Sequence, residues 1–245
     1  MTFAGGALAL AIGVAMGLFG AGGSLLLVPG LTYLVDMDAK QAITTSLAVI
    51  GISAAVGSAV RLRQGTLPIK PALVTGIATV IGAFGGSVIG ARLDDGVQLQ
   101  IFGVVVMVAA VAFGWQSAFG HDAIRSARGG TVLAAAGIGV GFLTGLLGVG
   151  GGFLIVPALV MGAHLGMREA TSVSLFVVVL ATASAFVGYA GTATPAWSFV
   201  LPFAALASVG IIAGGTAGHT LSHQRLQQVF AAGLVVVAAF IFTRG

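Results

Sequence analysis

Long apolar stretches alternate along this chain with short clusters of polar and charged residues. A helix of about 20 apolar residues crosses the roughly 30 Å core of a bilayer, and residues 170–224 contain no Asp, Glu, Lys or Arg. Strands of a membrane barrel would instead alternate apolar and polar residues over about 10 positions, which this chain does not do. The pattern therefore predicts an all-α polytopic membrane protein with roughly 8–10 membrane segments. We expect them near residues 4–20, 24–35, 42–60, 71–91, 98–119, 131–148, 152–164, 170–190, 197–218 and 226–243.

Composition supports this class and excludes others. Of 245 residues, 58% are hydrophobic and only 7% are charged, whereas about a quarter of a soluble domain is charged. The net charge of +4 comes from basic residues scattered at segment ends, which favours anchoring in the bilayer over nucleic-acid binding. Without cysteine there are no disulfides or thiolate metal sites. Nucleotide-binding and hydrolase motifs are missing, so we expect no enzyme activity and no metal or cofactor. The basic start of a signal peptide is also missing, so we expect no cleaved leader.

The chain contains an internal repeat. Residues 13–31, GVAMGLFGAGGSLLLVPGL, reappear as residues 141–159, GFLTGLLGVGGGFLIVPAL, at an offset of 128 positions. The same offset continues without a gap into later segments, and a search for self-similarity is the most direct test for duplication. We interpret 1–120 and 131–245 as two membrane repeats joined by a cytoplasmic linker, 121–130, and together forming one transport domain.

Loop charges predict that the repeats are inverted. The loop after the third segment carries Arg61, Arg63 and Lys70, whereas the matching loop near residues 191–195 carries no charge. Because basic loops stay in the cytoplasm, the first loop lies inside and the second outside. We expect a multi-pass protein of the cytoplasmic (inner) membrane of a prokaryote, with both termini outside. Inverted repeats with broken or re-entrant helices are a recurrent plan of secondary transporters, which bind substrate near the bilayer midplane.

A glycine cluster precedes the short second segment of each repeat, and glycine allows a helix to unwind. The half-helix that follows would aim free N–H groups and its positive dipole end at the cluster, which suits an anion. We expect the two breaks to meet in one polar cup, with hydroxyls of the next segment as further donors. The expected helix breaks are Gly20, Pro29, Gly148 and Pro157. The expected substrate-binding residues are Gly22, Gly23, Ser24, Thr45, Ser46, Gly150, Gly151, Gly152, Ser172 and Ser174.

Each of these features also has a structural interpretation. Hydroxyls at a helix start commonly cap it, and small residues spaced by four commonly mediate close helix packing. The latter interpretation is favoured for the ladders Gly82, Gly86, Gly90 and Gly210, Gly214, Gly218. Arg61 and Arg92 lie at segment ends, where we expect them to snorkel towards water, with a vestibule lining as the alternative.

The paired motifs GLFGAGGSLLLVPGL and GLLGVGGGFLIVPAL, each followed by a hydroxyl-rich start (AITTSL and ATSVSL), resemble the TauE/SafE sulfite exporter family. The resemblance covers residues 5–243. It implies an exporter of small sulfur-containing anions, such as sulfite or organosulfonates. The inverted repeats predict that transport occurs by alternating access. A channel, or a carrier for a carboxylate or a metal ion, is the alternative. The bilayer and the small anion are the expected partners, while coupling to H⁺ or Na⁺ and homo-oligomer formation stay open.

Overall fold

The computed structural model describes residues 3–20, 24–25, 27–119, 130–148, 152–162 and 164–218. All elements in this part of the chain are helical, which confirms the all-α class. The α-helices are α1 (Phe3–Phe19), α2 (Leu27–Leu34), α3 (Ala39–Arg63), α4 (Ile69–Gly90), α5 (Asp95–Phe119), α6 (Gly130–Leu147), α7 (Gly152–Pro157), α8 (Met167–Gly188) and α9 (Trp197–Gly218), and a π-helix, η2 (Ala158–Gly162), follows α7.

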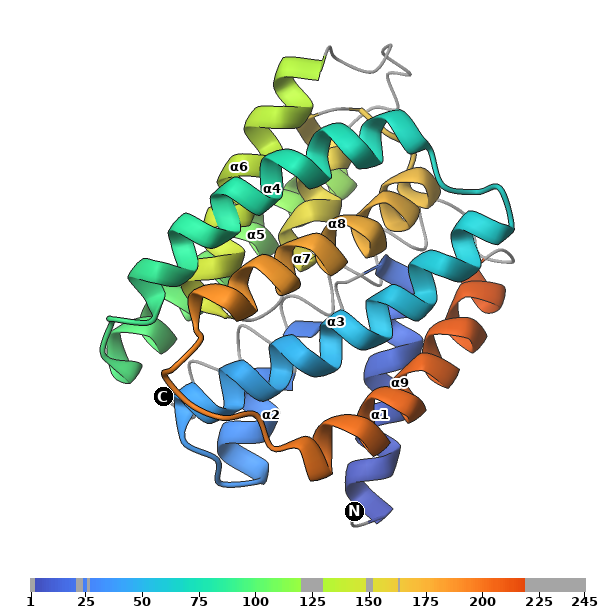
Figure 1. The fold of residues 1–245 in the computed structure, drawn as a ribbon. Coiled ribbons are helices and arrows are strands. Elements are labelled where there is room, and N and C mark those ends of the chain that lie inside the picture. Colours follow the sequence, from blue (N-terminus) through green and yellow to red (C-terminus); the bar gives the residue numbers. More distant parts are fainter. Residues whose placement is uncertain are drawn as a thin grey trace.

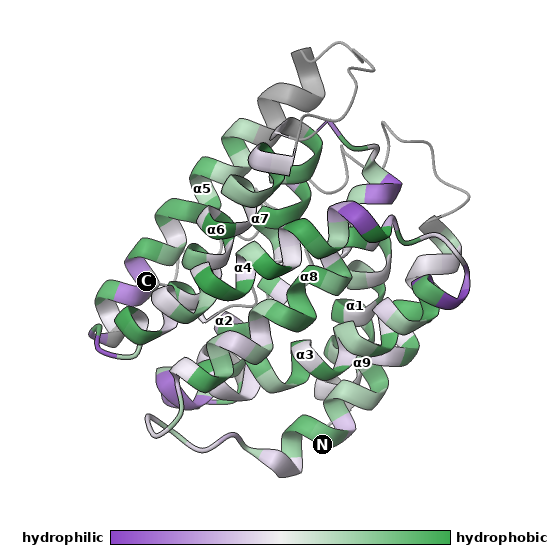
Figure 2. Ribbon diagram, turned by 45° about the horizontal axis from the view of Figure 1, so that its top comes forward, coloured by the Kyte–Doolittle hydropathy of each residue, from purple (hydrophilic) through white to green (hydrophobic). Residues whose placement is uncertain are grey.

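The helices match the apolar segments expected from the sequence. Among the described residues, α3, α4, α6, α8 and α9 are each long and apolar enough to cross a membrane. Hydrophilic residues gather near the helix ends and in the loops, while the helices themselves are mainly hydrophobic (Figure 2). The expected segment 226–243 and nearly all of the linker 121–130 lie outside the described residues.

The two repeats are interleaved. The main helix contacts run in the order α6, α4, α8, α3, α9, α1, and Figure 1 shows α3, α4 and α8 side by side in the middle. Adding 128 to the residue numbers of α1, α3 and α4 gives, within a few residues, those of α6, α8 and α9, respectively. When each helix is replaced by its equivalent in the other repeat, the contact order is the same in reverse. Each repeat therefore packs its fourth helix against the first helix of the other repeat.

Equivalent helices in the centre run in opposite directions. Gly51 of α3 faces Thr182 of α8, and Gly57, further along α3, faces Leu175, which comes earlier in α8. Figure 1 shows the same antiparallel course. The bundle thus has two ends, which we name after a residue at each: the Lys40 end, where α3 begins and α4, α6 and α8 end, and the Arg61 end, where α8 begins and α1, α3 and α9 end.

The glycine ladders bring helix backbones into contact, which confirms the packing interpretation. A Cβ atom added at Gly82, Gly86 or Gly90 of α4 would overlap the carbonyl oxygens of Ile138, Phe142 and Leu146 in α6, respectively. The second ladder repeats this arrangement, with Gly210 and Gly214 of α9 against α1. In this way small residues allow close packing where lipid provides no hydrophobic drive for helix association.

The α1–α2 hairpin begins and returns at the Lys40 end, because α1 runs parallel to α9 and α2 leads directly into the start of α3. Gly20 ends α1 with φ +72°, and Gly148 ends α6 with φ +64°; this left-handed conformation favours glycine after a helix. Pro157 is the last residue of α7, and the chain continues directly into the π-helix η2. Pro29 was expected to break its segment but does not: it lies in the first turn of α2, where the missing N–H has no helical acceptor, and the helix continues to Leu34.

Candidate functional site

Each helix break lies against the hydroxyl-bearing helix of the other repeat. A Cβ added at Gly20 would overlap the Oγ atom of Ser174 and press on the carbonyl of Thr171 in α8. At the equivalent break, Ser46 Oγ in α3 donates a hydrogen bond to the Gly148 carbonyl at 3.1 Å. The offset of 128 converts one arrangement into the other, so the chain holds two equivalent half-sites, one near each end of the bundle.

The serines of the two half-sites lie at different levels along the bundle. Because Gly57 of α3 contacts Leu175 of α8, the level of Ser174 lies about 11 residues beyond Ser46 along α3, or roughly 16 Å. Gly20 lies at the level of Ser174, which it contacts, and Gly148 lies at the level of Ser46. The central glycines of both breaks, Gly22, Gly23, Gly150 and Gly151, lie outside the described residues.

The hydroxyls of the half-sites lie inside their helices and do not cap them. α3 begins at Ala39 and α8 at Met167, several residues before the predicted starts. Ser46 Oγ shares its single proton between the Gly148 carbonyl and the Ile43 carbonyl, which lies 2.8 Å away, and Ser174 Oγ donates to the Thr171 carbonyl at 2.8 Å. Serine hydroxyls inside helices commonly bond a carbonyl of the preceding turn in this way.

The remaining expected binding residues are buried and do not all face a break. Thr45 Oγ1 accepts a hydrogen bond from the Ala196 backbone N–H at 3.1 Å and so ties the start of α9 to α3. Ser172 Oγ donates to the Arg168 carbonyl at 3.1 Å within α8. Ser24 is fully buried beside the first break, and Gly152 is buried at the start of α7. Substrate binding by these residues stays a prediction.

A polar cluster that the sequence did not single out closes the Lys40 end. Lys40 Nζ donates to the Gly90 and Leu93 carbonyls, both at 2.9 Å, and to Gln98 Oε1 at 3.0 Å. Gln98 Nε2 in turn donates to the Leu146 carbonyl and to the Tyr189 hydroxyl, both at 2.6 Å. These bonds join α3, α4, α5, α6 and the residue after α8, and they satisfy carbonyls that the helix ends leave open.

At the other end of the bundle, Arg61 occupies the position equivalent to Tyr189. Its side chain is only 9% exposed, and Nη2 donates to the Gly17 carbonyl in the last turn of α1 at 3.2 Å. The expectation that Arg61 snorkels is therefore wrong, because Gly215 leaves space for the guanidinium to turn inward and bond the end of α1. Arg92, in contrast, is exposed as expected.

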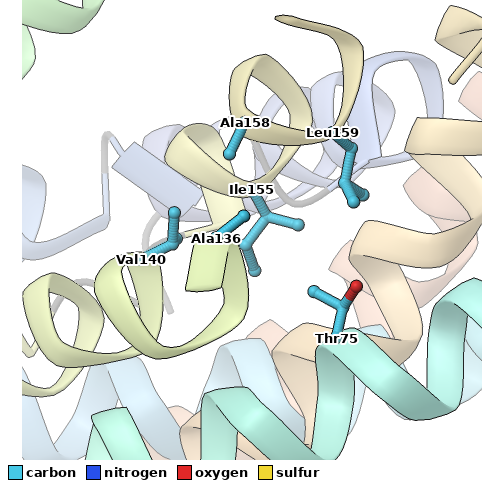
Figure 3. A pocket seen from close by; sticks show the side chains of 6 residues that line it. All are labelled: Thr75, Ala136, Val140, Ile155, Ala158 and Leu159. Carbon is cyan, nitrogen blue, oxygen red and sulfur yellow. The ribbon is translucent and has the colours of Figure 1, made fainter. Parts of the chain in front are cut away.

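A small apolar pocket lies between α4, α6 and the α7–η2 segment (Figure 3). It is too narrow for a water molecule, and the Thr75 hydroxyl, which points towards the other lining side chains, has no hydrogen-bond partner. The equivalent of Thr75 in the other repeat is Phe203, which is fully buried. The pocket is lined by Thr75, Ala136, Val140, Ile155, Ala158 and Leu159.

The apolar helices and the interleaved repeats together define a polytopic α-helical membrane protein. The family model for the sulfite exporter TauE/SafE matches residues 5–241, and this chain belongs to that family of membrane transporters. The match confirms the resemblance that the two glycine–proline motifs indicate.

Curated relatives agree with this assignment. The chain is 31% identical to a probable membrane transporter protein of Xylella fastidiosa strain Temecula1, over 94% of this chain and 90% of the relative. It is 24% identical to the probable membrane transporter protein MJ0441 of Methanocaldococcus jannaschii, over 87% and 83%, and 24% identical to the probable membrane transporter protein YunE of Bacillus subtilis, over 97% and 96%. No solved structure matches the chain.

Proposed function

We propose that this protein is a secondary transporter that exports small sulfur-containing anions, such as sulfite or organosulfonates, by alternating access between two inverted repeats. The observation that carries the proposal is the reciprocal contact of each break with the hydroxyl-bearing helix of the other repeat. Because the contacts are equivalent, a movement that opens one half-site at its end of the bundle would have an equivalent movement at the other end. Alternating access requires such a pair of movements.

The same arrangement supports a proposed membrane topology. The antiparallel course of α3 and α8 supports inversion of the repeats, and the basic loop with Arg63 and Lys70 would place the Arg61 end in the cytoplasm. Both termini would then lie outside. The anion would enter the first half-site from the cytoplasm and leave through the second.

Each half-site would offer the anion uncharged donors. Backbone N–H groups of the glycine clusters and the hydroxyls of Ser174 at one level and Ser46 at the other are suited to sulfite or sulfonate oxygens. Two levels roughly 16 Å apart along the bundle replace the single midplane cup as the proposed path. Ser24 adds a hydroxyl to the first break, where the second has Gly152.

Flux into proteoliposomes that contain the purified chain tests the proposal. Sulfite, sulfoacetate and taurine are compared with acetate, and saturable flux of at least one sulfur-containing anion is the expected result. Repeating the assay with an imposed H⁺ or Na⁺ gradient shows whether either ion is coupled. Flux that rises linearly without saturation would indicate a channel, and saturable flux of acetate alone would assign a carboxylate carrier.

A further inference from the structure

Arg61 differs from every other charged residue whose side chain the structure describes, because it alone is buried. Ionisable groups inside membrane proteins are costly and are retained where they serve ion or substrate pathways. We propose that Arg61 is a substrate-binding residue whose guanidinium receives the anion at the Arg61 end, beside the first glycine break. This inference deepens the proposed function and rests on it.

The position of Arg61 places it at the level of the first half-site. Arg61 follows Gly57 by one turn on the same face of α3, and Gly57 contacts Leu175 of α8. The neighbouring Ser174 meets Gly20, while the guanidinium holds the carbonyl of Gly17, one turn before that break. Three helices thus bring the charge, the hydroxyl and the break together.

The other repeat shows that packing alone requires a donor here and no charge. Tyr189 is the residue equivalent to Arg61, and its hydroxyl donates to the Leu146 carbonyl at 3.1 Å in the last turn of α6. Gln98 donates to the same carbonyl. Neutral donors therefore suffice at the equivalent helix end, so holding the Gly17 carbonyl does not by itself require a positive charge.

The surroundings also accommodate a guanidinium specifically. A Cβ at Gly215 would lie 3.3 Å from Arg61 Nη2, so glycine leaves the required space, whereas the equivalent residue at the other end is Ser87. A guanidinium has five N–H donors in a planar fork, which can hold the Gly17 carbonyl and also pair with two oxygens of an oxyanion. The half-site beside Arg61 would then bind the anion more tightly than the half-site beside Tyr189.

The experiment compares sulfite and sulfoacetate flux in proteoliposomes for the wild-type chain and four variants. Arg61→Gln removes the charge, Arg61→Lys keeps it without the fork, and Arg61→Tyr copies the other repeat. Arg63→Gln, which changes an exposed cation two residues away, is the matched control. We expect the KM to rise at least tenfold in Arg61→Gln and Arg61→Tyr and by less in Arg61→Lys, with a smaller change in maximal rate, and to stay within twofold in Arg63→Gln.

Size-exclusion chromatography of each purified variant separates binding from folding. A folded Arg61→Gln or Arg61→Tyr protein with the KM of the Arg63→Gln control would overturn the inference and leave the proposed function intact. Failure of all three Arg61 variants to fold would also overturn it, because the residue would then act in packing. A wild-type protein without saturable flux of either anion would instead refute the proposed function itself.

Discussion

At the Lys40 end of the bundle, the last turn of α6 is held by the neutral side chains of Tyr189 and Gln98; at the Arg61 end, the last turn of α1 is held by a guanidinium. The helices around both positions are related by the same offset and make the same backbone contacts. The comparison shows that the two repeats have equivalent backbone packing, whereas a few side chains differ between the two ends. Neutral donors are sufficient to hold the last turn of α6 at the Lys40 end, and the positive charge at the Arg61 end is the feature that we propose to bind the anion.

The largest effect should come from breaking the contact between a glycine break and its serine. Gly20→Ala places a Cβ against Ser174 Oγ at a left-handed position, which should cost about 2–4 kcal/mol in stability from backbone strain and overpacking together. We expect a large loss of folded protein in detergent, measured as the melting temperature by fluorescence-detected size exclusion.

A second substitution makes this prediction specific. Ser174→Ala removes the overlapping Oγ atom and should restore part of the stability of Gly20→Ala. Ser46→Ala, the equivalent change in the other repeat, serves as the control and should not restore it. Equal rescue by both serine variants would contradict the reciprocal pairing of breaks and helices.

A smaller loss is expected when the polar cluster of the Lys40 end is opened. Lys40→Met removes the side-chain donor to the Gly90 and Leu93 carbonyls and to Gln98 Oε1, which should cost about 2–3 kcal/mol. Arg168, the equivalent residue of the second repeat, is exposed, and Arg168→Met should change the melting temperature little. Similar losses in both variants would show that the two ends are stabilised alike.

Removing a single hydroxyl at the same end should have a more modest effect. Tyr189→Phe deletes the donor to the Leu146 carbonyl and the acceptor of Gln98, and we expect a loss of about 1–2 kcal/mol by thermal unfolding in detergent. Transport should persist, because Gln98 still holds the same carbonyl. An unchanged melting temperature would argue against a stabilising role for the hydroxyl.

The smallest effect concerns the apolar pocket beside Thr75. Thr75→Val removes a buried hydroxyl that lacks a partner, so stability should stay equal or rise by up to about 1 kcal/mol. Thr79→Val is the control, because Thr79 Oγ1 donates to the Thr75 carbonyl at 2.7 Å and its loss should be slightly unfavourable. A clear destabilisation in Thr75→Val would reveal a partner for its hydroxyl within the native protein.

Much of the fold could be predicted from local patterns. Apolar run length located the helices to within a few residues, because a bilayer sets the length of a crossing. Spacing of small residues identified the ladder of Gly82, Gly86 and Gly90 as a packing surface. The effect of Pro29 was predicted wrongly, since a proline is compatible with the first turn of a helix and the sequence did not show where α2 would begin.

The candidate site was less predictable, because it depends on contacts between distant segments. The hydroxyls were identified, but their partners were not, since Ser174 and Gly20 belong to different repeats. Arg61 and Lys40 looked like ordinary loop charges in the sequence. The offset of 128 already aligned Arg61 with Tyr189, and that inequality was the available signal for a difference between the two ends.

The sequence by itself determined the membrane class, the family and the duplication, because these follow from the number of apolar residues, from motifs and from self-similarity along the chain. Only the tertiary structure decided that the repeats interleave, that each break meets the other repeat, and that Arg61 turns inward while Arg92 faces out. The reason is physical: hydrophobic length is a property of each segment, whereas the burial of a charge depends on which backbones approach closely enough to surround it.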